Sequence, residues 1–228
     1  MGKIIGLGGG GYIDGEMLNV SRFIFECAEK EKPAFLFLPT ASFDEYDENS
    51  DVLTTFRSYG CKIDILLLTD ETLTKDEIRE KILSADIIYA DGGNLRFMMN
   101  TFIKTGADAA LKEAYEKGTV LSGISSGMMC WFAQGYDDCD DGEFAFVDCL
   151  SLLPYVTCPH FENGRWPTFE TAVKGNNYSG LAMENGAAFV YIDGKTSVMN
   201  GKDGGMIYLF DKDKNHAKEI FGGVPQKE

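Results

Sequence analysis

The pattern Gly123-Ile124-Ser125-Ser126-Gly127 is the part of the sequence best suited to chemistry. It follows a short apolar run at 119–121 and precedes an apolar run that favours a helix from Met128. A sharp strand-to-helix turn needs small residues on both sides, so that the middle residue can adopt strained backbone angles and present its hydroxyl. The pattern therefore predicts that Ser125 is a nucleophile, with the N–H of Ser126 placed to stabilise an oxyanion. A glycine-rich turn without chemistry is the alternative.

A serine nucleophile needs a base, and the chain contains only two histidines. His216 lies in the charged segment 211–216, where solvent would leave its imidazole without a fixed orientation. His160 follows an apolar run at 152–156 and is predicted by elimination to be the base; a partly buried structural histidine is the alternative. Many acids could orient the imidazole, and spacing alone does not choose among them. Glu184, just before a predicted strand, is the best placed.

Two further glycine-rich segments each admit more than one interpretation. Asp91-Gly92-Gly93-Asn94 closes a predicted strand and opens a helix, so that it fits either a backbone oxyanion donor or a turn with Asn94 as the helix N-cap. Gly6-Leu7-Gly8-Gly9-Gly10-Gly11 satisfies G-x-G-x-x-G, but the acid that holds a ribose is missing after the second strand. A dinucleotide site is therefore disfavoured. Residues 137–142 suggest a calcium loop, but Cys139 occupies its third ligand position, so an acidic surface turn is expected.

The elements that must position these residues alternate between strand and helix patterns over the first two thirds of the chain. Predicted strands at 3–7, 34–38, 62–68, 86–90 and 119–121 are separated by helical stretches at 16–30, 51–59, 75–83, 94–105 and 107–117. This alternation is typical of a parallel sheet with helices on both faces. Later strands at 187–192, 196–199 and 206–210, with a short helix near 168–174, predict an antiparallel extension of one sheet edge. No repeat or linker is present, so a single domain over 1–228 is expected.

Composition excludes several classes of protein. The 228 residues carry a net charge of −15 at pH 7, which disfavours nucleic acid as a partner. The longest apolar runs are far shorter than the ~20 residues that span a bilayer, and no export signal opens the chain, so a cytoplasmic protein with no membrane partner is expected. None of the six cysteines forms a CxxC pair, which predicts reduced thiols and no metal. No cofactor is expected.

With these residues in view, the sequence resembles the peptidase E (aspartyl dipeptidase) family of serine peptidases, relatives of cyanophycinase. The resemblance covers about 4–192 and rests on the Ser125 pattern, the segment 91–94, Pro159-His160-Phe161 and the segment 180–184 in the same order. It implies an α/β fold: a flavodoxin-like three-layer sandwich of the class I glutamine amidotransferase-like superfamily, with a mostly parallel central sheet and antiparallel C-terminal strands. It also implies a Ser125–His160–Glu184 triad, with Gly93 and Ser126 as the oxyanion donors.

The sequence departs from the family pattern at two places. A one-residue shift of the alignment near 183 puts Asn185 in the place of Glu184, and the imidazole would then lack a charged partner. Family members that remove an N-terminal Asp use an Arg in a basic segment after the histidine, whereas here Arg165 is the only cation before Lys174. Asn94 and Arg165 are the candidate substrate-binding residues.

The expected function is hydrolysis of small peptides through an acyl-enzyme on Ser125, dipeptidase-like but without an assumed preference for Asp-X. The alternative is a catalytically weak or inactive homologue that binds a small ligand or partner in the same cleft. The protein is expected to be a monomer or a homodimer.

Overall fold

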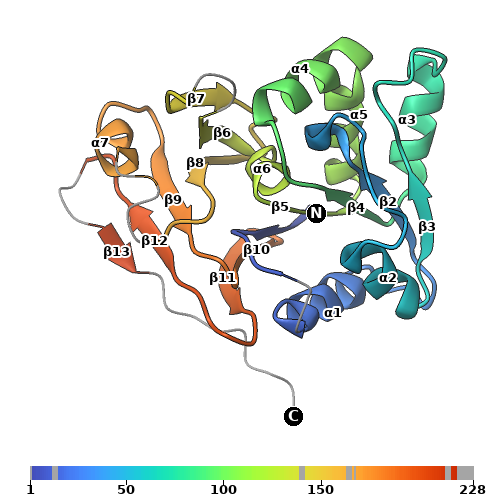
Figure 1. Cartoon of the computed structure of the whole chain (residues 1–228), viewed down its shortest axis with the longest axis horizontal. Coiled ribbons are helices and arrows are strands. Elements are labelled where there is room, and N and C mark those ends of the chain that lie inside the picture. The colour runs from blue at the N-terminus through green and yellow to red at the C-terminus, as the bar shows by residue number, and fades with distance from the viewer. Residues whose placement is uncertain are drawn as a thin grey trace.

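A seven-stranded, mostly parallel sheet forms the centre of the computed structural model, which describes residues 2–11, 15–138, 142–162, 166, 168–213 and 217–219. Its strand order is β11-β10-β1-β5-β4-β2-β3 (Figure 1). The five parallel strands are β1 (Lys3–Leu7), β5 (Val120–Ile124), β4 (Ile87–Ala90), β2 (Ala34–Leu38) and β3 (Lys62–Ile65). Antiparallel β10 (Ala187–Ile192) pairs with β1 and carries β11 (Lys195–Asn200) at the edge. The predicted fold class is confirmed.

The inner strands are largely apolar and buried because helices cover both faces of the sheet. Helices α1 (Leu18–Cys27) and α2 (Asp51–Ser58) lie on one face, and α3 (Lys75–Ser84), α4 (Leu95–Thr105) and α5 (Ala107–Glu116) lie on the other (Figure 1). Alternate residues of β2 enter different cores, since Phe35 and Phe37 pack toward α1 and α2 while Leu36 and Leu38 pack toward the opposite helices.

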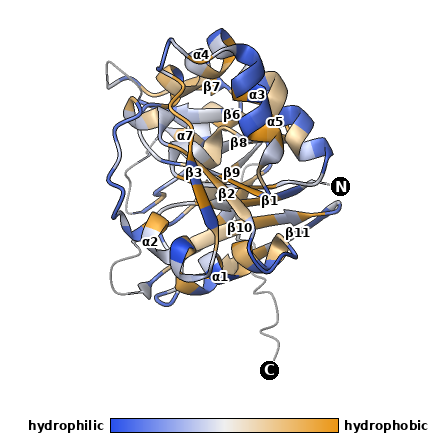
Figure 2. Ribbon diagram, turned by 90° about the vertical axis from the view of Figure 1, so that its right-hand side faces the viewer, coloured by the Kyte–Doolittle hydropathy of each residue, from blue (hydrophilic) through white to orange (hydrophobic). Residues whose placement is uncertain are grey.

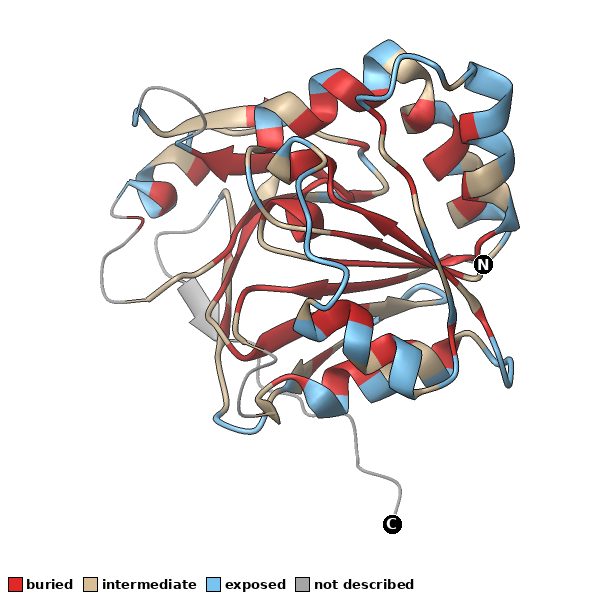
Figure 3. Ribbon diagram, turned by 45° about the vertical axis from the view of Figure 1, so that its right-hand side comes forward, coloured by how far each residue is buried: buried red, intermediate tan, exposed pale blue. Residues whose placement is uncertain are grey.

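The helices are amphipathic in the way this layering requires. Their outer faces are exposed and hydrophilic, while the strands between them are buried and hydrophobic (Figures 2 and 3). Helix α3 begins with a capping box between Thr74 and Glu77, and α4 ends at Gly106, which has a φ of +78°. The longest helix, α4, has 11 residues, and no helix among the described residues has the length and apolarity to cross a membrane.

A second sheet of six strands, in the order β13-β12-β9-β8-β6-β7, lies beside the first (Figure 1). Its strands are β6 (Phe132–Asp137), β7 (Ala145–Asp148), β8 (Leu153–Cys158), β9 (Ser179–Met183), β12 (Ile207–Phe210) and β13 (Ala217–Glu219). The pairs β6–β8 and β8–β9 are parallel, and the other pairs are antiparallel. Short helix α7 (Phe169–Val173) packs on its outer face.

The second sheet corrects two expectations from the sequence. The segment 206–210 was expected to extend the edge of the first sheet, but β12 pairs with β9 instead. The helix expected from Met128 is only the four-residue α6 (Ser126–Met129), after which the chain enters β6. All of the apolar residues from Met128 to Phe132 are fully buried, so no polar residue recurs to distinguish a helical period from a strand period.

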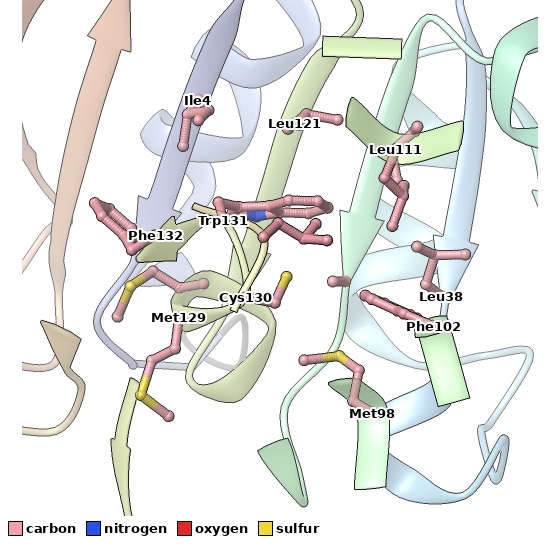
Figure 4. Packing of buried hydrophobic residues seen from close by; sticks show 14 of the residues in the cluster. Ile4, Leu38, Met98, Phe102, Leu111, Leu121, Met129, Cys130, Trp131 and Phe132 are labelled. Carbon is pink, nitrogen blue, oxygen red and sulfur yellow. The ribbon is translucent and has the colours of Figure 1, made fainter. Parts of the chain in front are cut away.

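One apolar core joins the two sheets and fixes the position of α6. The fully buried Trp131 lies beside Ile4 of β1 and Leu121 of β5, with Phe132 close by (Figure 4). The same cluster includes Leu153 and Leu181 of the second sheet. The turn between β5 and α6 is therefore held from both sides, at the carboxyl ends of the parallel strands, where α/β sheets usually place their sites.

Candidate functional site

Ser125 lies in a strained turn between β5 and α6. Its backbone has φ 55° and ψ −124°, outside the regions that non-glycine residues normally adopt, while its side chain is partly exposed. A Cβ on Gly123 would lie 2.4 Å from the carbonyl oxygen of Gly127, and a Cβ on Gly127 would lie 2.0 Å from that of Ala90. Only glycine therefore fits at either flank, as the sharp turn expected from the sequence requires.

His160 lies beside Ser125, although 35 residues separate them in sequence. Its Nε2 is 3.0 Å from the Ser125 Oγ, the distance of a hydrogen bond. His160 has a φ of 50°, its N–H donates to the Gly8 carbonyl at 2.9 Å, and its own carbonyl accepts from the Trp166 indole at 3.1 Å. The loop after β8 is thus pinned to the end of β1, which fixes the imidazole against the serine.

Asn185 holds the other side of the imidazole. Its Oδ1 is 2.6 Å from His160 Nδ1. The Asn185 Nδ2 donates to Glu162 Oε2 at 3.0 Å, and the Asn185 backbone N–H donates to Glu162 Oε1 at 2.7 Å. Because the amide NH₂ faces a carboxylate, the amide oxygen must face the imidazole, so Nδ1 carries the proton and Nε2 presents a lone pair to Ser125.

Glu184, the first choice for the third member of the triad, points elsewhere. Its carboxylate accepts from the Met206 N–H and from the Tyr208 hydroxyl, both at 3.0 Å. The chain turns between β9 and β10, where the Ala187 N–H donates to the Glu184 carbonyl at 3.3 Å. The two side chains leave this turn in different directions, so Glu184 reaches β12 while Asn185 reaches His160. The structure therefore brings the alternative residue, Asn185, to the imidazole and uses Glu184 to tie the turn to the second sheet.

The glycine-rich loop after β1 joins the three segments of this site. Ser125 N–H donates to the Leu7 carbonyl at 3.1 Å, and Gly186 N–H donates to the Gly9 carbonyl at 3.1 Å. A Cβ on Gly9 would lie 1.9 Å from Asn185 Oδ1 and 2.3 Å from His160 Nδ1. The loop is thus a close-fitting support for the His–Asn pair. Its Gly8 and Gly11 N–H groups donate within the protein, to Ala187 and Glu16, and not toward a ligand.

The segment after β4 borders Ser125 on the remaining side. A Cβ on Gly92 would come within 3.2 Å of the Ser125 Cβ, and the Ser126 hydroxyl donates to the Gly93 carbonyl. The Gly92 N–H donates to Asp91 Oδ1 at 2.9 Å, and burial raises the pKa of the Asp91 carboxyl above its ordinary value. Gly93 and Ser126, the predicted oxyanion donors, are therefore in hydrogen-bond contact with each other.

Asn94 has the capping role that the sequence left open. Its Oδ1 accepts from the Phe97 N–H at 2.8 Å, and its own N–H donates to the Ala41 carbonyl at 2.7 Å. Arg165, the other candidate substrate-binding residue, lies outside the described residues, as do His216 and Cys139. Among the described residues no three His, Cys, Asp or Glu side chains converge in a way that could hold a metal ion.

Sequence reasoning missed Glu162. It lies two residues after His160, with Trp166 close behind, and nothing in its spacing distinguishes it from the many other acids of the chain. Its significance depends on the approach of the β9–β10 turn, which comes 23 residues later in sequence.

Comparisons with known proteins show which proteins this chain is similar to. The family model of peptidase family S51 matches residues 4–199. The uncharacterized peptidase YgaJ of Bacillus subtilis (strain 168) is 31% identical over 197 residues, which cover 85% of this chain and 84% of the relative. The uncharacterized peptidase PM1590 of Pasteurella multocida (strain Pm70) is 27% identical over 152 residues, covering 63% of this chain and 72% of the relative.

Two solved structures share the fold. A peptidase from an acI-B1 actinobacterium superposes with a TM-score of 0.75 at 17% identity, covering 98% of this chain and 96% of that one. A Listeria monocytogenes EGD-e protein described as a candidate peptidase E superposes with a TM-score of 0.69 at 20% identity, covering 88% of this chain and 98% of that one.

Proposed function

Because the chain belongs to peptidase family S51, the peptidase E family, and is therefore a peptidase, we propose that Ser125 is its nucleophile and His160 its general base. The observation that carries the proposal is the continuous set of contacts Ser125 Oγ–His160 Nε2 at 3.0 Å and His160 Nδ1–Asn185 Oδ1 at 2.6 Å. A nucleophile, a base within hydrogen-bond reach and a third group that orients the base are the signature of activated serine chemistry.

The proposed reaction proceeds in two halves. Ser125 Oγ attacks the peptide carbonyl carbon while its proton passes to His160 Nε2, which has the free lone pair. As the tetrahedral intermediate collapses, the C–N bond breaks and His160 returns the proton to the leaving amine. A water then attacks the acyl-serine ester, gives its proton to His160, and releases the carboxylic acid with Ser125 restored.

The negative charge of the intermediate falls on the carbonyl oxygen, which needs preorganised donors. The backbone N–H groups of Gly93 and Ser126 are proposed for this role, because Ser126 follows Ser125 directly, Gly92 contacts Ser125, and the Ser126 hydroxyl bonds to the Gly93 carbonyl. Removing one such donor typically costs about 10²–10³ in kcat. No metal or cofactor takes part in these steps.

The proposed substrates are small peptides, with dipeptides as the first to test. Four acidic side chains form hydrogen bonds in the segments that make up the site, namely Glu16, Asp91, Glu162 and Glu184. An acidic surround suits the cationic N-terminal amine of a short peptide and repels an Asp side chain. An Asp-X preference would therefore require Arg165 to supply the compensating positive charge.

The test compares wild type with Ser125→Ala on a panel of Asp-X, Ala-X, Gly-X and Leu-X dipeptides, together with a fluorophosphonate probe that labels activated serines. The expected result is labelling at Ser125 by mass spectrometry and dipeptide cleavage that the substitution abolishes without changing the melting temperature. Absence of labelling in folded wild type would refute the serine mechanism. It would favour a homologue that only binds a ligand or partner at this site.

A further inference from the structure

We propose that Glu162 is a positioning residue of this site. The direct partner of the His160 imidazole, Asn185, is neutral, and Glu162 supplies a negative charge to the imidazole through Asn185. The inference rests on the proposed function, because it assigns a part of the same serine mechanism to Glu162. An asparagine alone can orient an imidazole, but its neutral oxygen stabilises an imidazolium less than a carboxylate does.

The contacts form one unbroken line from the charge to the nucleophile. Glu162 accepts from the side chain and from the backbone of Asn185, at 3.0 Å and 2.7 Å. Asn185 then accepts from His160 at 2.6 Å, and His160 faces Ser125 at 3.0 Å. Hydrogen bonds in series polarise one another, so a carboxylate on the amide NH₂ makes the amide oxygen a stronger acceptor for the imidazole proton.

The backbone around Glu162 favours this role over a casual surface contact. Its N–H donates to the His160 carbonyl at 2.9 Å, and the Phe161 N–H between them donates to Met183 at 2.9 Å. The base and its charged support are thus carried on one short loop, docked against β9. Glu162 is also half-buried, so its carboxylate is partly shielded from the solvent that weakens exposed pairs.

The other titratable groups on elements packed against this loop have separate partners. In the described part of the chain these pairings are Glu16 with the Gly11 N–H, Asp91 with the Gly92 N–H, and Glu184 with the Met206 N–H and the Tyr208 hydroxyl. None of these bonds reaches the Asn185 amide. Glu162 is therefore the acid whose loss acts directly on the His–Asn pair.

The geometry also predicts which substitutions disrupt the line and which restore it. Glu162→Gln would turn an NH₂ toward one of the two Asn185 donors, so two donors would face each other and one of the two hydrogen bonds would be lost. Asn185→Asp would set a second carboxylate against Glu162. The double variant Glu162→Gln/Asn185→Asp restores the pattern, because the new carboxylate accepts from both the imidazole and the new amide, while the backbone N–H of residue 185 keeps an acceptor.

The experiment measures the rate of Ser125 labelling by the fluorophosphonate in the full-length wild type, the two single variants and the double variant, with thermal unfolding of each. Each single substitution is expected to slow labelling by about 10–100-fold, the order expected for a misoriented catalytic group. The double variant is expected to recover to within about threefold of wild type, a strong positive coupling. A double variant that is as slow as the product of the two singles overturns the proposal.

A pH profile and a spectrum separate positioning from simple structural support. Glu162→Gln should move the acid limb of the labelling rate to lower pH, because the imidazolium loses a stabilising carboxylate. The imidazole Nδ1 proton, observed by NMR with His216→Gln to remove the other histidine, should shift upfield. This spectrum does not need activity. An unlabelled wild type with the predicted NMR shift would therefore refute the serine mechanism and keep the Glu162 contact, whereas an unmoved proton refutes the inference itself.

Discussion

Gly9→Ala is the substitution that tests most directly how the fold positions the His160 imidazole, the proposed base. The new Cβ would lie 1.9 Å from Asn185 Oδ1 and 2.3 Å from His160 Nδ1, whereas real Cβ contacts are essentially never under 3.0 Å. The Asn185 oxygen must therefore retreat by about 1.1 Å, the difference between 1.9 Å and 3.0 Å. The contact between Asn185 Oδ1 and His160 Nδ1 is now 2.6 Å. A shift of this size away from the imidazole would lengthen it beyond the reach of a hydrogen bond.

The expected result is a large loss of activity in a protein that still folds. A misplacement of about 1 Å costs on the order of 10²-fold in rate, and complete loss of the imidazole orientation costs about 10⁴-fold. The backbone of Gly9 has a φ of 152°, so alanine there also introduces strain of about 1–3 kcal/mol. The assay is the labelling rate of Ser125 together with urea denaturation.

Gly194→Ala is the matched control. Gly194 also has a positive φ, of 83°, but a Cβ there would meet nothing within 4 Å, and it lies in the β10–β11 turn. It should lose comparable stability and keep wild-type activity. Wild-type activity in a folded Gly9→Ala protein would refute the argument that the glycine loop keeps His160 and Asn185 together.

Two further predictions concern stability and thiol chemistry. Burial raises the pKa of Asp91, so the folded state binds this proton more tightly than the unfolded chain and the ionised carboxylate destabilises the fold. The free energy of unfolding of Asp91→Asn, relative to wild type, should therefore increase as the pH rises from about 4 through the folded pKa of Asp91. Urea denaturation across pH 3.5–7 would measure this difference. A difference that does not change with pH contradicts this reasoning. Burial also raises the pKa of Cys27 and of Cys61 to about 11, and that of Cys130 well above its ordinary value. At pH 8 about one thiol in a thousand would then be ionised at Cys27 and Cys61. Iodoacetamide should therefore leave Cys27, Cys61 and Cys130 unmodified in native protein and modify them in urea, as mass spectrometry would show. Rapid labelling of the native protein would contradict the burial argument.

Local sequence patterns were enough to predict the elements of the first sheet. Apolar strands of about five residues alternate with helices, and this alternation yields parallel pairing because each crossover needs a helix. The prediction for β10 (Ala187–Ile192) matches the structure residue for residue. The glycines on both sides of Ser125 likewise revealed a steric requirement of the chain itself, which is why the turn could be predicted.

Most of the second sheet was not predicted. The strand β12 was expected, but at the edge of the first sheet, and the run that leads from Met128 into β6 lacks an alternating pattern. The run from Met128 to Phe132 is buried on every side, between the two sheets, and burial on every side removes the polar positions that mark a period. The pairing of β12 with β9 could not be predicted either, because both β9 and the edge of the first sheet are distant in sequence and no local pattern distinguishes between them.

The sequence by itself determined the glycine-flanked turn at Ser125, the parallel sheet that ends in it, and the reduction of the candidate bases to two histidines. Only the tertiary structure decided that Asn185 and not Glu184 faces the imidazole, and that Glu162 stands behind it. The physical reason is that Glu184 and Asn185 lie at the turn between β9 and β10, where the direction of each side chain depends on the neighbours packed around the turn. Those neighbours are Gly9, His160 and Tyr208, all far away in sequence, and their approach exists only once the two sheets have packed together.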